Sequence, residues 1–369
     1  MELYHIRGRV RGLAYGILII MDQFNTTNTL NDGTFFDWGL FRRDVRRDVR
    51  NCVLFLLFFY GVNLAASGIV IIISVFTSPG FWDAVTSASL SAVANPGGSP
   101  SIDTSAIMDA IAGQSGEVLG LASIVGIVAG GCVFLICRKR RFFTDVALPA
   151  AEPMTAKIFI VLIVVTQAVQ IVYSLIVSLI DKLLPSGLSL EESYSSVMEG
   201  LMSPVGVLYI VLIGPIFEEL IFRGAVFGAL RRFGENYAIL FSALLFGFYH
   251  MLILQIPFAF VLGLLLGYVA SRWTLRASIA LHIIVNGLSV LLSSTHSEVG
   301  QGVITLGMIV CAFATLIMAI AWRRQFWARV HTGAAYYART YANGFSSIAF
   351  WIFIVIMAGA GLLQMNLMG

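Results

Sequence analysis

The chain alternates between long apolar stretches and short polar segments from residue 52 onward. A helix that crosses a lipid bilayer needs roughly 20 mostly apolar residues, and several of these stretches are long enough. The pattern therefore predicts an all-α, polytopic membrane bundle of about nine transmembrane helices. The predicted spans are residues 52–77, 118–137, 158–180, 205–230, 237–253, 256–271, 277–294, 303–322 and 348–368.

The boundary between the fifth and sixth predicted spans is the weakest in the pattern. Only His250, Gln255 and Pro257 interrupt one continuous apolar run at this point. A tight turn between two helices and a re-entrant hairpin are both compatible with such a run.

Positively charged residues predict how the bundle is oriented, because cytoplasmic loops of membrane proteins collect lysine and arginine. If the N-terminus is inside, all 23 lysine and arginine residues fall in inner segments except Lys182 and Arg223. Lys182 lies in an outer loop and Arg223 lies within a span. This distribution predicts an N-in orientation and, for nine spans, a C-terminus outside.

Composition agrees with a membrane protein. The 369-residue chain is 58% hydrophobic and only 12% charged, with a mean hydropathy of +0.88, whereas soluble domains carry about 25% charged residues. We expect a multi-pass integral protein, in the cell membrane if the host is prokaryotic, with the lipid bilayer around it and no nucleic acid partner. The four cysteines lie in or at the ends of predicted spans, so no disulfide framework is predicted.

Three predicted spans carry polar side chains that a lipid environment disfavours. They are Glu218, Glu219 and Arg223 in the fourth span, His250 in the fifth, and His282 and Asn286 in the seventh. An ionisable side chain at bilayer depth costs a few kcal/mol, so it usually faces a protein-lined or wet cavity and has a function there. We therefore expect Glu218, His250 and His282 to share one cavity near mid-membrane.

Spacing along the fourth span predicts different surroundings for its two glutamates. Glu219 and Arg223 are four residues apart, which places opposite charges on one helical face. Glu218 points about 100° away around the helix and has no such partner nearby in sequence, so we expect it to be the reactive carboxylate. Pro215 removes a backbone hydrogen bond to Val211 and predicts a kink that opens room just before the acids.

The other polar residues suit hydrolysis by water. His250 follows Phe246 by one helical turn and Asn286 follows His282 by one turn, so each polar residue has a neighbour on the same face. A carboxylate or an imidazole can take a proton from water, while hydrogen-bond donors stabilise the oxyanion that forms. The candidate catalytic residues are Glu218, His250, His282 and Asn286.

At these positions the sequence resembles the CAAX prenyl protease and bacteriocin-processing family of intramembrane endopeptidases, also called the Abi family. The matching motifs, in the family's order, are Glu218-Glu219-x3-Arg223-Gly224, Phe246-x3-His250 and His282-x3-Asn286. Each motif is weak alone, but the three together are very specific. The resemblance covers about residues 155–295, and the first 150 residues match nothing in it.

The resemblance implies a glutamic-type peptidase without a cofactor, acting on a peptide or membrane-protein substrate. It assigns water activation to Glu218 and His250, the oxyanion hole to His282 and Asn286, and a supporting ion pair to Glu219 and Arg223. The chain then divides into a cytoplasmic leader (1–51), N-terminal spans with an outer loop (52–150), a catalytic membrane domain like that of the family (151–300) and C-terminal spans (301–369).

Other functions use the same residues differently. In a zinc-dependent intramembrane protease, His250, His282 and a glutamate would bind the metal that activates water. The order along the chain permits this, but the sequence has no His-Glu-x-x-His motif and asparagine is a poor zinc ligand. A transporter or proton relay should show broken helices in corresponding halves, and the sequence shows no repeat. A non-catalytic scaffold or immunity protein that keeps the fold is the further alternative.

Overall fold

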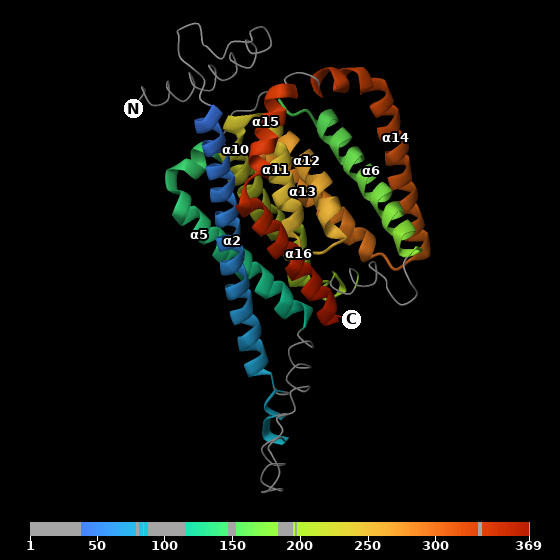
Figure 1. Cartoon of the computed structure of the whole chain (residues 1–369). Helices are drawn as coiled ribbons and strands as arrows, with labels where there is room; N and C mark the ends of the chain where they lie inside the picture. The colour runs from blue at the N-terminus through green and yellow to red at the C-terminus, as the bar shows by residue number, and fades with distance from the viewer. Residues whose placement is uncertain are drawn as a thin grey trace.

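The computed structural model of the protein describes residues 38–78, 81–83, 85–87, 115–146, 153–183, 195, 198–330 and 334–368. Regular secondary structure in these ranges is entirely helical, which confirms the all-α fold class. Figure 1 shows the long helices packed side by side in a bundle. The long helices are α2 (Trp38–Thr77), α5 (Gly116–Val146), α6 (Ala156–Asp181), α11 (Glu235–Tyr249), α12 (Gln255–Arg272), α13 (Leu275–Ser293), α14 (Glu298–Val330), α15 (Ala334–Phe345) and α16 (Ile348–Met368).

Within the described residues, seven helical segments are long and apolar enough to cross a membrane. They correspond to the first four predicted spans and to the sixth, seventh and eighth. The fifth is α11, whose 15 residues rise only about 22 Å, less than the bilayer core of about 30 Å. The ninth is represented by the shorter apolar segment Ile348–Leu362. The protein is a multi-pass integral membrane protein, while the count of nine and the N-in orientation stay predictions.

Helices α11 and α12 form an antiparallel hairpin with a tight turn between them. Two glycines of α12 allow the helices to approach closely. A Cβ atom added to Gly263 would lie 3.1 Å from the Cα atom of Ala243, and one added to Gly267 would lie 3.2 Å from Ile239. Small residues four apart commonly permit such contact between membrane helices. The turn lies between Tyr249 and Gln255, so it divides the apolar run that joins the fifth and sixth predicted spans.

Helix α2 is continuous across the predicted boundary at residue 51, so residues 38–51 extend the first span as one helix. Residues 1–37 of the predicted leader and most of the predicted outer loop 78–117 lie outside the described residues. Helix α5 packs on α2, and a Cβ atom at Gly126 would collide with the side chains of Asn63 and Ser67. The N-terminal helices are therefore packed tightly at the level of Asn63.

Helix α16 packs against α2 and α11 within the largest buried apolar cluster. Its residues Phe350, Phe353 and Met357 are at most 2% exposed. Gly361 lies against the backbone carbonyl of Met251, where a side chain would collide. The C-terminal helix therefore supports the turn between α11 and α12.

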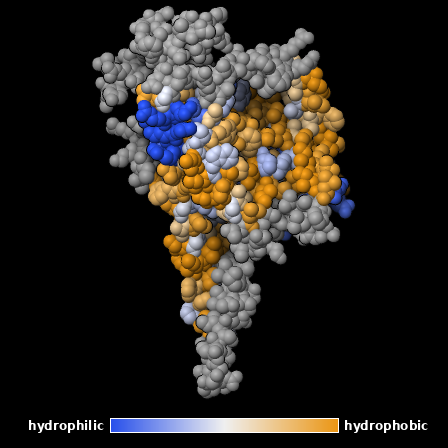
Figure 2. All heavy atoms as spheres, in the orientation of Figure 1, coloured by the Kyte–Doolittle hydropathy of each residue, from blue (hydrophilic) through white to orange (hydrophobic). Residues whose placement is uncertain are grey.

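The outer surface of the bundle is mostly apolar, as contact with lipid requires. Large exposed apolar side chains include Ile69, Leu175, Phe313 and Val355, each more than half exposed. In Figure 2 hydrophobic residues cover most of the coloured side surface, and hydrophilic residues gather near the start of α2. This surface agrees with the assignment as a membrane protein.

Candidate active site

The helical run that carries both glutamates is a regular α-helix only in part. It begins with α8 (Pro204–Leu208) and continues through η1 (Tyr209–Ile213), α9 (Gly214–Glu219), η2 (Leu220–Phe227), α10 (Gly228–Leu230) and η3 (Arg231–Phe233). The segments η1 and η2 are π-helical, and such segments are rare and frequently found at functional sites. The two glutamates therefore lie between two local departures from α-helical winding.

In η1 a backbone carbonyl is available to a side chain. The N–H of Gly214 donates to the carbonyl of Tyr209, five residues back, and Pro215 has no N–H that could donate to Ile210 in the same pattern. The side-chain amide of Asn286 donates to Ile210 instead, with 2.9 Å between Nδ2 and the carbonyl oxygen. The sequence predicted that Pro215 frees the carbonyl of Val211, four residues back. In the structure the freed carbonyl belongs to Ile210, because π-helical winding pairs each N–H with the carbonyl five residues back.

The segment η2 is bound to a neighbouring helix in the same manner. The hydroxyl of Ser242, a buried residue of α11, donates to the carbonyl of Phe222 at 2.7 Å. Each π-helical segment therefore has one carbonyl that accepts a hydrogen bond from a polar side chain of another helix. We call the helical run from Pro204 to Phe233 the central run. These two bonds fix it against α11 and α13.

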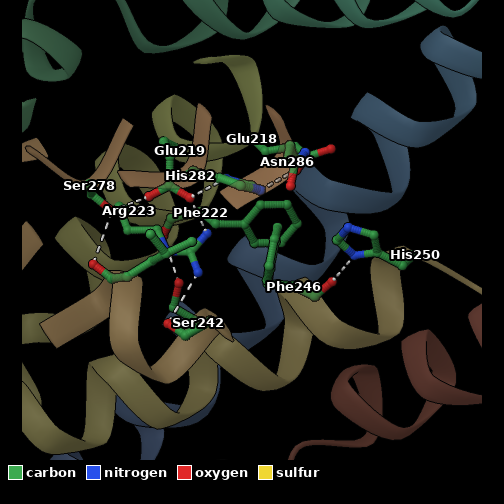
Figure 3. A network of polar contacts seen from close by, with 12 residues as sticks. Glu218, Glu219, Phe222, Arg223, Ser242, Phe246, His250, Ser278, His282 and Asn286 are labelled. Carbon is green, nitrogen blue, oxygen red and sulfur yellow. Dashed lines mark hydrogen bonds and ion pairs between the residues drawn. The ribbon is translucent and has the colours of Figure 1, made fainter. Parts of the chain in front are cut away.

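Glu219 is completely buried, and three donors surround its carboxylate (Figure 3). Arg223 pairs with Oε1 at 2.7 Å, and Ser278 donates to Oε2 at 2.5 Å. Nδ1 of His282 lies 3.1 Å from Oε1. The predicted ion pair between Glu219 and Arg223 is confirmed, and two further residues of α13 complete its surroundings.

Arg223 is also held by other groups. Its Nη2 donates to the carbonyl of Gly263 on α12 at 3.1 Å. Its guanidinium carbon lies 4.3 Å from the centre of the Phe246 ring, within the range of a cation–π interaction. Burial of this charge is therefore compensated by a carboxylate, a carbonyl and an aromatic face.

His282 lies between the two glutamates. Its Nδ1 contacts Glu219, and its Nε2 is 3.8 Å from Oε2 of Glu218. Because a carboxylate only accepts hydrogen bonds, the contact with Glu219 assigns a proton to Nδ1. The other ring nitrogen is then directed to the side where Glu218 lies.

His250 follows the last residue of α11, and its ring has a defined tautomer. Nδ1 lies 2.9 Å from the carbonyl oxygen of Phe246, which can only accept, so Nδ1 carries the proton. In the neutral ring Nε2 therefore has a free lone pair. The next residue, Met251, has a φ of 61°, which is uncommon for a residue other than glycine and turns the chain sharply after the histidine.

A cavity of about 270 Å³ brings the four candidate catalytic residues together. Glu218, His250, His282 and Asn286 all line it, and the side chain of Glu218 is 13% exposed. Glu219 and Arg223 are not part of its lining. The residues predicted to react and those predicted to support them thus occupy different positions relative to the cavity.

Comparison with known proteins identifies the segment that contains this cluster. Residues 200–288 match the family described as Type II CAAX prenyl endopeptidase Rce1-like. This segment is similar to the Rce1-like family. The membrane-embedded CAAX protease MroQ of Staphylococcus aureus (strain USA300) is 25% identical over 191 residues, which make up 49% of this chain and 76% of that protein. No solved structure matches the chain.

The resemblance found in the three motifs is confirmed by these matches. The Rce1-like segment contains all six predicted site residues, from Glu218 to Asn286. Together with the membrane-spanning helices, it supports an intramembrane protease, a hydrolase of peptide bonds.

The Rce1-like segment does not form the cavity alone. Tyr60 and Asn63 of α2 also line it, beside Tyr209 and Tyr249 of the segment itself. Nδ2 of Asn63 donates to the hydroxyl of Tyr249 at 3.4 Å. Sequence reasoning missed these residues because a tyrosine or asparagine in an apolar helix has no spacing that reveals a partner almost 200 positions away.

Ser278 was also missed, although the sequence carries a signal for it. It precedes His282 by four residues, as His282 precedes Asn286, so the three side chains form one polar stripe on α13. Extending the His-x3-Asn spacing by one turn toward the N-terminus would have indicated that Ser278 faces the same buried acids.

The donor groups near the cavity bear on the zinc alternative. Across the described ranges, histidine, cysteine, aspartate and glutamate form no group of three or more that could hold a metal ion. The two histidines of the site each direct one nitrogen to a protein oxygen, at Phe246 for His250 and at Glu219 for His282. A metal would have to use their remaining nitrogens together with Glu218.

Proposed function

We propose that the protein is a glutamic-type intramembrane endopeptidase that hydrolyses a peptide bond with an activated water. The observation that carries this proposal is the position of Glu218, His250, His282 and Asn286 around one cavity. Hydrolysis by water requires a proton acceptor, a means of orienting water and donors for the oxyanion, and these four side chains can provide them. Burial of Glu219 and Arg223 behind the cavity supports a structural role for that pair.

In this mechanism Glu218 and His250 act on the water molecule. Nε2 of His250 accepts one hydrogen bond from the water, because Nδ1 is already committed to the carbonyl of Phe246. The carboxylate of Glu218 takes a proton from the same water as the oxygen attacks the peptide carbonyl carbon.

Attack forms a carbon–oxygen bond and moves the carbonyl electron pair onto the oxygen, which gives a tetrahedral oxyanion. As this intermediate collapses, the carbon–nitrogen bond breaks and the proton held by Glu218 passes to the leaving nitrogen. One water is consumed, and the products are a carboxylic acid and an amine. Glu218 ends in its starting protonation state.

Asn286 and His282 stabilise the oxyanion. The amide of Asn286 has two hydrogens, and the bond to Ile210 uses one, which leaves the other for the oxyanion. Nδ1 of His282 donates to Glu219, so donation by Nε2 requires a ring that carries both protons. Placing donors where negative charge develops is usually worth a factor of about 10²–10³ in kcat for each donor.

Glu219, Arg223 and Ser278 position these groups without touching substrate. Glu219 fixes the ring orientation of His282, while Arg223 and Ser278 fix Glu219. This arrangement follows the logic of catalytic sites in which a third group orients the residue that reacts.

The proposed substrate is a peptide segment or membrane protein whose peptide bond reaches the cavity at the membrane. The name of the Staphylococcus aureus relative refers to a CAAX protease, and a prenylated tail is one form of such a substrate. A peptide released from a membrane-bound precursor is another. Identification of cleaved sites distinguishes these two.

The decisive experiment replaces Glu218 with glutamine and compares new protein N-termini in membranes that contain the parent or the variant. We expect the termini produced by the parent to disappear with Glu218→Gln, while the variant inserts and purifies as the parent does. Glu235→Gln is the matched control, because Glu235 is an exposed glutamate at the start of α11. Cleavage retained by Glu218→Gln would contradict the mechanism.

A further inference from the structure

The two ends of the helical bundle differ in charge. Apart from Lys182 and the buried Arg223, every lysine and arginine with a described side chain lies in segments that meet at one end. These residues define the basic end: Arg42, Arg43, Arg46, Arg47, Arg50, Lys157, Arg231, Arg232, Arg272 and Arg276.

Contacts between distant segments hold the basic end together. Arg232 forms an ion pair with Asp48 at 2.5 Å, which joins the end of the central run to the first part of α2. Trp273, next to Arg272, belongs to a buried cluster against which Ile158 of α6 packs. In Figure 1 the start of α2, the start of α6 and the end of α12 lie at the same end of the bundle.

The cavity extends toward the opposite end. Its lining includes Met198 and Leu201, which precede α8, Leu252 in the turn between α11 and α12, and Gln255 at the start of α12. None of the residues that define the basic end lines it. The turn is also bonded to the second half of α6, away from the basic end, because the hydroxyl of Tyr173 donates to the carbonyl of Leu254.

Lysine and arginine mark the cytoplasmic side of a membrane protein, so the basic end is expected to face the cytoplasm. We propose that the cavity receives its substrate from the opposite, extracytoplasmic side of the membrane. The substrate class is then peptide segments that are exported or membrane-anchored and reach the outer surface. Tails of cytoplasmic proteins would lie on the wrong side. The inference about cleavage rests on the proposed peptidase function, whereas the side to which the cavity opens does not.

Single cysteines test the proposal in the full chain. Leu252→Cys reports on the cavity, His296→Cys on the exposed start of α14 at the same end, and Asn236→Cys on the exposed start of α11 at the basic end. The background is a full-length chain in which serine replaces the native cysteines Cys52, Cys132, Cys137 and Cys311. A membrane-impermeant maleimide is added to intact spheroplasts or to lysed membranes.

We expect Leu252→Cys and His296→Cys to be labelled in intact spheroplasts, and Asn236→Cys only after lysis. Labelling of Leu252→Cys only after lysis would overturn the proposal, since the cavity would then open to the cytoplasm. If Leu252→Cys does not accumulate in membranes, Gln255→Cys at the start of α12 replaces it, and the same outcomes decide.

The location of cleaved bonds tests the substrate class. We expect the sites that are cut by the parent and not by Glu218→Gln to lie in extracytoplasmic segments. Sites confined to cytoplasmic tails would overturn the inference. If no site depends on Glu218, the proposed function fails, while the labelling result still establishes which side the cavity faces.

Discussion

Two adjacent glutamates have contrasting surroundings in this protein. Glu219 is fully enclosed by Arg223, Ser278 and His282. The side chain of Glu218 keeps 13% of its surface exposed and lines the cavity. A rotation of about 100° around the helix is sufficient to separate an enclosed carboxylate from an accessible one. The different surroundings of the two carboxylates therefore depend on position, since the side chains are identical.

Arg223→Ala is expected to destabilise the protein as well as to reduce its activity. Removing one partner of a buried ion pair leaves the charge of Glu219 uncompensated, at a cost of roughly 3–5 kcal/mol. Thermal unfolding in detergent and the yield of purified protein should both fall relative to the parent.

A double substitution separates the ion pair from any contact with substrate. Glu219→Gln combined with Arg223→Met removes both charges, so its thermal stability should recover relative to Arg223→Ala. An Arg223→Ala protein as stable as the parent but inactive would instead place Arg223 in substrate binding or catalysis.

Tyr249→Phe is expected to affect substrate binding more than folding. The change keeps the ring that packs on Phe222 and removes the hydroxyl that accepts from Asn63. That hydroxyl retains its own hydrogen for a group in the cavity, and a neutral hydrogen bond is worth about 1 kcal/mol. We expect KM to rise about fivefold with little change in kcat or thermal stability. A fall in stability with an unchanged KM would show that the hydroxyl only supports the fold.

Local spacing predicted the buried pair but not all of its surroundings. Four residues separate Glu219 from Arg223, so one helix alone brings them together. The hydrogen bond from Asn63 to Tyr249 joins residues 186 positions apart, and it forms only once α2 is packed on the hairpin. Contacts of this second kind depend on tertiary packing and leave no periodic signal in the sequence.

Pro215→Ala tests how the π-helical segment η1 positions Asn286. Alanine restores an N–H that can donate to Ile210, which would compete with the side chain of Asn286. We expect kcat to fall by up to the factor of about 10²–10³ that one oxyanion donor contributes, while the unfolding temperature stays unchanged or rises because a proline is removed from a helix interior.

A double-mutant cycle gives the control for this prediction. If Pro215 acts through Asn286, the activity of Pro215→Ala with Asn286→Ala should equal that of Asn286→Ala alone, because the two changes remove the same interaction. Additive losses would mean that the proline affects the site by another route.

At the level of elements, apolar length predicted most spans, but not the winding within them. A run of apolar residues has the same appearance in the sequence whether it folds as an α-helix or a π-helix. In η1 and η2 the side chains of Asn286 and Ser242, from other helices, bind carbonyls of the wider segments. The fifth span was predicted too long because the chain turns at Met251, whose φ of 61° is not encoded by a glycine.

For the whole molecule, the metal-free mechanism predicts insensitivity to chelators. Treatment of the purified protein with 1,10-phenanthroline should leave cleavage intact, and bound zinc should be far below one per chain. Metal analysis and the peptidase assay on the same preparation provide the measurement. Stoichiometric zinc whose removal stops turnover would favour the zinc-dependent alternative.

The wall that α2 adds to the cavity has an evolutionary consequence. Tyr60 and Asn63 belong to a part of the chain outside the segment shared with the Rce1-like family, whereas the candidate reactive groups all lie inside it. Selection can then alter the first helix without disturbing the acids and histidines. If the proposed function holds, we expect that exchanging α2 between homologues changes which peptides are cleaved and leaves the hydrolysis reaction itself unchanged.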